Sequence, residues 1–173
     1  MYTIKSKLPV LIVIAFMLTG ALVSSCKKEA DTSINNLLTG NGIWRLASMR
    51  VETLHGDTTI RRDTLNTNCG FAQSFKFTDD ARCTYKYYSC INDSASSTWE
   101  LTSNDYDSVF LRSPLVCKDT TKIGTISIRP FSRSQVINLG RNSLILQTVI
   151  IDTFRKTPVV VLRRKITRYG FIH

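Results

Sequence analysis

The stretch Ser74-Phe-Lys-Phe-Thr-Asp-Asp-Ala-Arg-Cys-Thr-Tyr-Lys-Tyr-Tyr88 decides the fold. Apolar and polar residues alternate on both sides of Asp79-Asp80-Ala81, which is the pattern of a β-hairpin. With these three residues as the loop, Phe75 lies opposite Tyr85, and the register assigns every side chain to one face or the other. One face then holds Phe75, Phe77, Cys83, Tyr85 and Tyr87.

The hairpin register also predicts a disulfide. It brings Cys69 and Cys90 together at the open end of the hairpin, within reach of a bond. An even number of cysteines besides Cys26 favours disulfides in an exported chain, and four cysteines allow three connectivities. Cys83 with Cys117 would be the remaining pair, and a free, buried Cys83 is the alternative.

Period-two alternation extends from Trp44 to the end of the chain. Ten or so short segments of this kind are separated by turn residues, and no helical periodicity interrupts them. This pattern predicts an all-β, antiparallel sandwich or barrel and excludes a parallel βαβ architecture. Before Trp44, the spacing of Ile34, Leu37 and Leu38 predicts a short helical turn.

The N-terminus carries a targeting signal. Lys5 and Lys7 precede the apolar run from Leu8 to Val23, and two serines lead to Cys26. This order resembles a bacterial lipoprotein signal, which implies cleavage before Cys26 and acylation of that cysteine by chains such as palmitate. A membrane-spanning anchor and a plain secreted protein are the alternatives; the apolar run is shorter than the roughly 20 residues that a spanning helix needs.

The signal sets the expected organisation of the chain. Residues 1–25 are the signal peptide, 26–40 a lipidated tether with a short helix, and 41–173 one β-domain. Because lysine rather than aspartate follows Cys26, the resemblance implies an anchor in the outer membrane. The sequence does not decide between its periplasmic face and its surface face. The expected partner is therefore the membrane, through the lipid on Cys26.

Positive charge is concentrated near the C-terminus. The chain has a formal net charge of +10, and residues 129–173 hold nine basic residues against Asp152 alone. Such a block fits either the solvated face of a sheet or attraction to anionic lipid headgroups. Nucleic acid is not expected as a partner of an exported chain that lacks interleaved basic and aromatic residues.

Gly42-Ile43-Trp44 follows the predicted helical turn and begins the first strand. This motif, together with the cysteine-flanked aromatic hairpin, resembles the lipocalin-like domains of Gram-negative envelope lipoproteins. The resemblance implies an up-and-down barrel of about 8–10 strands whose first and last strands pair. Gly42 and Trp44 would close one end under a basic side chain from the last strand, with Arg164 chosen from the candidates Arg163, Arg164 and Arg168.

The chain departs from the lipocalin pattern in two places. The turn that usually reads Asp-Gly is Asp80-Ala81, and residues 131–139 have no firm counterpart.

Two functions follow from a barrel of this kind. In the first, Phe75, Tyr85 and Phe110 line a cavity that binds a small apolar or amphipathic ligand. In the second, the same residues fill a solid core, and the protein is an interaction or scaffold module whose surface binds protein or glycan. A cavity favours the first, and a packed core with an exposed apolar patch favours the second. The sequence does not identify a protein partner.

The sequence offers no constellation for catalysis. His55 lies in an expected turn and His173 at the end of the chain, so neither is placed beside a nucleophile. No two cysteines have CxxC spacing, so a zinc site is not expected. We therefore expect neither an enzyme nor a bound metal or cofactor.

Overall fold

The structure is a computed structural model that describes residues 34–40, 42–65, 69–104, 106–121, 124–156 and 159–173. The chain divides into two units, Met1–Asn36 and Leu37–His173. Residues 34–39 are helical, as the spacing of Ile34, Leu37 and Leu38 predicts. The signal peptide, Cys26 and most of the expected tether lie outside the described residues.

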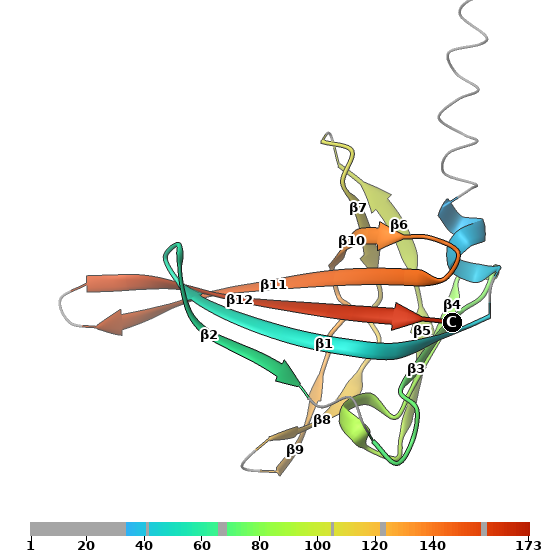
Figure 1. Cartoon of the computed structure of the whole chain (residues 1–173), viewed down its shortest axis with the longest axis horizontal. Helices are drawn as coiled ribbons and strands as arrows, with labels where there is room; N and C mark the ends of the chain where they lie inside the picture. Colours follow the sequence, from blue (N-terminus) through green and yellow to red (C-terminus); the bar gives the residue numbers. More distant parts are fainter. Residues whose placement is uncertain (1–33, 41, 66–68, 105, 122–123, 157–158) are drawn as a thin grey trace, which may run out of the picture. The chain divides into compact units, whose positions relative to one another are not determined.

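The second unit is built almost entirely of strands, which confirms the all-β prediction (Figure 1). The first seven are β1 (Ile43–His55), β2 (Thr58–Leu65), β3 (Ser74–Phe77), β4 (Arg82–Lys86), β5 (Ser94–Thr98), β6 (Glu100–Ser103) and β7 (Val109–Arg112). The last five are β8 (Cys117–Thr121), β9 (Gly124–Ile128), β10 (Ser134–Leu139), β11 (Ser143–Lys156) and β12 (Val159–Ile172). A 3₁₀ turn, η2 (Tyr88–Cys90), follows β4.

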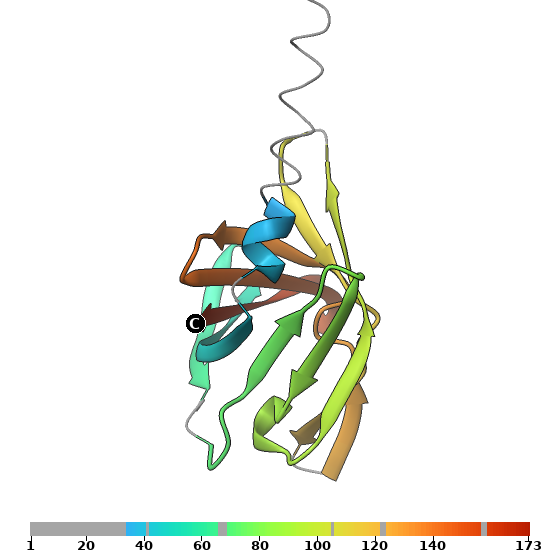
Figure 2. The same cartoon turned by 90° about the vertical axis from the view of Figure 1, so that its right-hand side faces the viewer.

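The strands form a nearly closed barrel. They pair antiparallel in the order β5-β4-β3-β1-β12-β11-β10-β7-β6, while β2 pairs with β1, and β8 and β9 form a separate hairpin. The first and last strands, β1 and β12, are neighbours, as the prediction required. In Figure 2, β3, β4 and β5 (green) face the viewer.

Trp99 links the two ends of this strand order. β5 ends at Thr98 and β6 begins at Glu100, so the chain passes from one end of the sheet to the other across a single residue. The backbone N–H of Trp99 donates to the carbonyl of Ala81 (2.9 Å), and Ser113 Oγ donates to the carbonyl of Thr98 (2.8 Å). One bent strand therefore completes the barrel.

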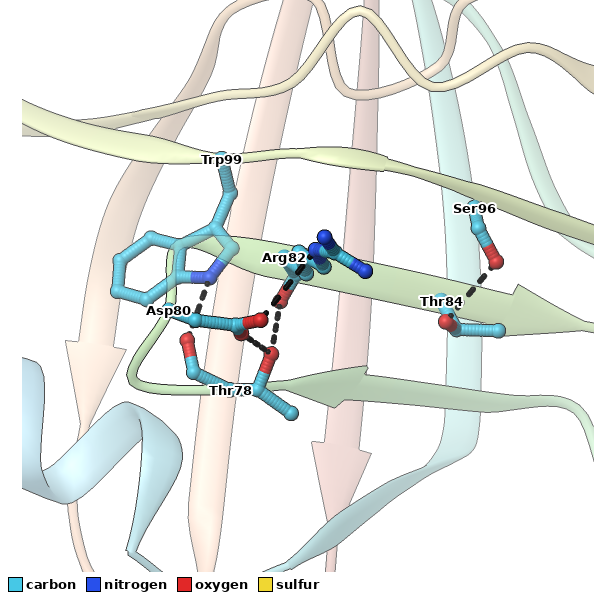
Figure 3. Close-up of polar contacts among 6 residues, drawn as sticks. All are labelled: Thr78, Asp80, Arg82, Thr84, Ser96 and Trp99. Atoms are coloured by element: carbon cyan, nitrogen blue, oxygen red, sulfur yellow. Dashed lines mark hydrogen bonds and ion pairs between the residues drawn. The ribbon is translucent and has the colours of Figure 1, made fainter.

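The hairpin of β3 and β4 has the predicted register, with Phe75 opposite Tyr85. At its turn, Thr78 Oγ1 contacts Asp80 Oδ1 (2.5 Å) and the carbonyl of Arg82 (3.0 Å), and Trp99 Nε1 donates to the carbonyl of Thr78 (3.2 Å) (Figure 3). Ala81 takes the left-handed conformation, with φ 58°, at the point where the lipocalin pattern has glycine. These contacts hold a turn that is strained for alanine.

Aromatic rings fill the closed half of the barrel. Phe131, from the segment between β9 and β10, enters the interior and lies 4.7 Å from Phe75, 5.5 Å from Tyr85 and 5.1 Å from Tyr169 between ring centroids. Phe75, Tyr85 and Phe131 are all fully buried. Residues 131–139 have no firm counterpart in the lipocalin pattern. Their first residue, Phe131, thus packs within the aromatic core.

Three strands are longer than the barrel needs. β1, β12 and β11 continue past it as a ribbon, and the far ends of β11 and β12 extend beyond β1 (Figure 1). Within the barrel, the residues of these strands that face inward are buried, for example Leu146 and Tyr169. Alternation along each strand then defines an inner face of the ribbon, continuous with the barrel interior, and an outer face.

Candidate functional site

The predicted cavity residues do not line a common cavity. Phe75 and Tyr85 lie in the packed aromatic cluster around Phe131. Phe110 is on the opposite face of β7 from the buried Leu111, and the guanidinium carbon of Arg133 lies 4.4 Å from its ring centroid. Phe75 and Tyr85 are therefore core residues, and the prediction that they contact a ligand is corrected.

Trp44, at the start of β1, has a different partner from the basic side chain that was predicted. It is fully buried, and its Nε1 donates to the carbonyl of Leu38 (2.9 Å). The ring of His173 lies against it, 3.7 Å away between centroids and tilted by 38°. Gly42, at φ 90°, makes the turn into β1 that only glycine adopts easily. The closing side chain on Trp44 is thus an imidazole.

Arg164 lies far along the sheet from Trp44. It is opposite Leu54 on β1 and Ile151 on β11, and its guanidinium donates to the carbonyl of Gly56 (3.0 Å) and to the Asp57 carboxylate. The pairing of β1 with β12 brings the end of β12, rather than its middle, to the Trp44 end. Arg164 is therefore not a closure residue.

The cysteines divide into a bonded pair and two thiols. Cys69 and Cys90 form the predicted disulfide, with Cα atoms 5.3 Å apart. Cys83 and Cys117 are free and buried, which corrects the second pairing and agrees with the alternative of a free Cys83. The Cys83 sulfur lies 3.2 Å from Ser113 Oγ. Burial raises the pKa of Cys83 and raises that of Cys117 to about 12, so both are protonated at neutral pH.

A hollow of about 860 Å³ lies beyond the aromatic core, at the end of the barrel away from Trp44. Its wall includes inner-face residues of three neighbouring strands: Met49 and Val51 of β1, Thr148 and Ile150 of β11, and Lys165 and Thr167 of β12. Ile126 and Ile128 of β9 complete the apolar part of the wall. This volume is in the range of small-molecule sites in proteins.

Hydroxyl groups gather where the hollow meets the core. The oxygens of Tyr88 and Tyr169 are 3.2 Å apart, and Thr148 and Thr167, which also line the hollow, are buried. Burial raises the pKa of Tyr88 far above its ordinary value, and burial, opposed by the hydrogen bond from Tyr88, raises that of Tyr169 to about 12. Both phenols are therefore neutral donors and acceptors at physiological pH.

Charged side chains lie at the rim. Arg129, Arg133 and Lys165 line the hollow together with Asp119, so positive charge exceeds negative charge there. A smaller hollow of about 400 Å³ continues along the inner face of the ribbon and shares Val51, Ile150 and Lys165 with the first. The site thus combines apolar walls, a hydroxyl floor and a basic rim, which suits an amphipathic ligand.

The comparisons with known proteins give no family. No protein-family model, no curated protein and no solved structure matches the chain. Among the residues that the structure describes, no helix is long and apolar enough to cross a membrane. Within the same part of the chain, no group of three or more histidine, cysteine, aspartate or glutamate side chains could hold a metal ion.

Most of the hollow was missed by reasoning from sequence. Thr148, Thr167 and Lys165 are ordinary members of alternating strands, and nothing in their neighbourhood along the chain marks them. The one available signal was the length of the alternating segments that became β11 and β12, because strands longer than the barrel must leave it. Phe110 is the only predicted ligand residue among those that line this hollow.

Proposed function

We propose that this protein is a non-catalytic, lipocalin-like lipoprotein of the outer membrane that holds a small amphipathic ligand in the hollow at the open end of its barrel. The observation that carries the proposal is the hollow itself, with its apolar wall and its floor of neutral hydroxyls. An apolar ligand body would lie against Val51 and Ile128, and a polar group would reach the Tyr88 and Tyr169 hydroxyls. The lipid on Cys26 would keep the domain at the membrane.

Ligand binding is tested with the fluorescent apolar probe N-phenyl-1-naphthylamine, followed by displacement with fatty acids. Thr167→Trp adds bulk on the inner face, in the wall of the hollow, and should weaken probe binding about tenfold or more. Arg168→Trp, on the outer face one residue along, is the matched control and should bind the probe as the parent does. If the parent protein binds no probe, or both variants bind it equally well, the proposal is wrong.

Anchoring is tested separately. Replacing Cys26 with serine removes the acceptor sulfur, so labelling by a fatty-acid analogue should be lost and the protein should leave the detergent phase. Persistent labelling of the Cys26→Ser protein would contradict lipidation at this residue without bearing on the hollow.

The second candidate is a solid barrel that binds through its surface. The observation in its favour is the packed cluster of Phe75, Tyr85 and Phe131, which leaves the closed half of the barrel without room for a ligand. The probe experiment separates the two candidates, since a surface module would give no binding that Thr167→Trp affects.

A further inference from the structure

The outer face of the ribbon exposes a group of aliphatic side chains that flank Arg164. Val149 and Ile151 of β11 and Val160 and Leu162 of β12 all point to this side, and each is 43–58% exposed. Ile166 pairs with Val149 and extends the strip towards the barrel. We call these five residues the outer strip. Isolated exposed aliphatic residues are ordinary, but several gathered on one face of a sheet indicate a contact surface.

The net charge beside the outer strip is positive, because the acidic residues there are paired with arginines and further arginines lie nearby. Glu52, opposite Ile166, pairs with Arg62 at 3.1 Å, and Asp57 pairs with Arg164. Arg50 and Arg168 lie opposite each other on the same outer face, next to Ile166 at the end of the outer strip that is nearer the barrel. Arg168 Nε donates to Gln147 Oε1 (2.7 Å), which is a neutral acceptor and does not offset the positive charge of the guanidinium.

The inner face of the ribbon is different. Asp152 and Arg163 pair across it, with Arg163 Nε 2.8 Å from Asp152 Oδ1, and Lys165 lies nearby on the same face. Ile150 is the counterpart of Ile151 there: the two isoleucines are adjacent and equally exposed, at 58%, and they point to opposite sides. The aliphatic strip is therefore a property of one face.

Charge decides among the occupants that would cover the strip. A second copy of the chain would bring together two faces that each carry Arg50 and Arg168, which is unfavourable. An anionic bilayer accepts both features, since aliphatic side chains enter the headgroup boundary and arginines meet the lipid charges. We propose that the outer strip, with Arg50 and Arg168, docks the domain on the surface of an anionic membrane.

This inference does not depend on the ligand. It is tested with the chain from Cys26 to His173 carrying Cys26→Ser, so that no acyl group contributes. Its core residues, from Leu38 to Phe171, and the pairing of β1 with β12 all lie within Leu37–His173, so this form retains everything that closes the barrel. The probes are vesicles of phosphatidylcholine alone and of phosphatidylcholine mixed with phosphatidylglycerol, with binding measured by co-sedimentation.

We expect binding to the vesicles that contain phosphatidylglycerol and much weaker binding to the neutral ones. Ile151→Asp should lower the binding constant about tenfold or more, while the matched Ile150→Asp should leave it within about twofold. In the acylated full chain, a fluorophore on Ile151→Cys should be quenched by a spin-labelled lipid, and one on Ile150→Cys should not.

Three results would overturn the inference. They are equal effects of the two aspartate substitutions, equal binding to neutral and anionic vesicles, and a dimer in sedimentation velocity that Ile151→Asp dissociates. The last result would assign the strip to a second copy of the chain. Failure of vesicle binding with intact probe binding would leave the proposed function standing.

Discussion

The barrel half and the ribbon half of β11 and β12 use the same strands in opposite ways. In the barrel, the inward residues Leu144, Leu146, Tyr169 and Phe171 are buried. In the ribbon, the outer face exposes Val149, Ile151, Val160 and Leu162, while the inner face combines the exposed Ile150 with the charged Asp152, Arg163 and Lys165. Hydrophobic alternation therefore locates strands, but which face it buries depends on whether other strands complete the enclosure.

The largest expected effect separates the two halves by stability. Trp44→Ala removes a buried aromatic residue and should lower the free energy of unfolding by about 3–5 kcal/mol. Ile151→Ala, in the ribbon, should change it by less than about 0.5 kcal/mol, because the side chain is exposed and packs on little. Urea unfolding followed by circular dichroism measures both. A comparable loss in the two variants would show that the ribbon is covered in solution.

Tyr169, which lies where the barrel half meets the ribbon half, should make the free energy of unfolding depend on alkaline pH. The pKa of Tyr169 is raised to about 12 from an ordinary value of 10.0, chiefly by burial, so the folded protein holds this proton more tightly than the unfolded chain. Its contribution of about 3 kcal/mol is complete below pH 10 and is lost as the pH rises towards 12. Unfolding free energies measured between pH 8 and 12 should fall more steeply for the parent than for Tyr169→Phe. Parallel curves would mean that water reaches the phenol.

The smallest effect concerns strain on the barrel side. Ala81 is held at φ 58° in the turn between β3 and β4, and glycine adopts this conformation without the penalty that a Cβ brings. Ala81→Gly should therefore raise stability by about 1 kcal/mol, seen as a higher melting temperature. Gly56→Ala, at φ 58° in the turn between β1 and β2 on the ribbon side, should have the opposite sign. Two changes of the same sign would show that backbone strain does not govern these turns.

Local pattern predicted the parts of the fold that neighbours in sequence determine. The three-residue loop gave the register of Phe75 with Tyr85, and that register placed Cys69 beside Cys90. The resemblance to lipocalins predicted that the first and last strands pair, and β1 does pair with β12. Each of these follows from turn length, period-two alternation or a short motif.

The wrong predictions concern contacts between strands that are far apart in the sequence, because the register between such strands decides which residues meet. A register shift between Leu46 and Ser48, together with the length of β12, decides which residue of β12 reaches Trp44, and neither can be read from the sequence. Phe131 was not predicted as a core residue, because it lies between β9 and β10 and not on an alternating strand. The hollow was missed because its lining residues come from strands that are distant in sequence, and alternation within each strand does not show how the strands are placed.

The pairing of β1 with β12 has a consequence for how the chain folds. Hairpins such as β3 with β4 and β11 with β12 join residues that are close in sequence, whereas Arg45 pairs with Ile172 across most of the domain. Contacts so distant in sequence carry the largest entropic cost of loop closure and slow folding. Closure of the barrel is therefore expected to follow hairpin formation. Until then, Trp44 lacks the contact with His173, and the facing edges of β1 and β12 stay unpaired.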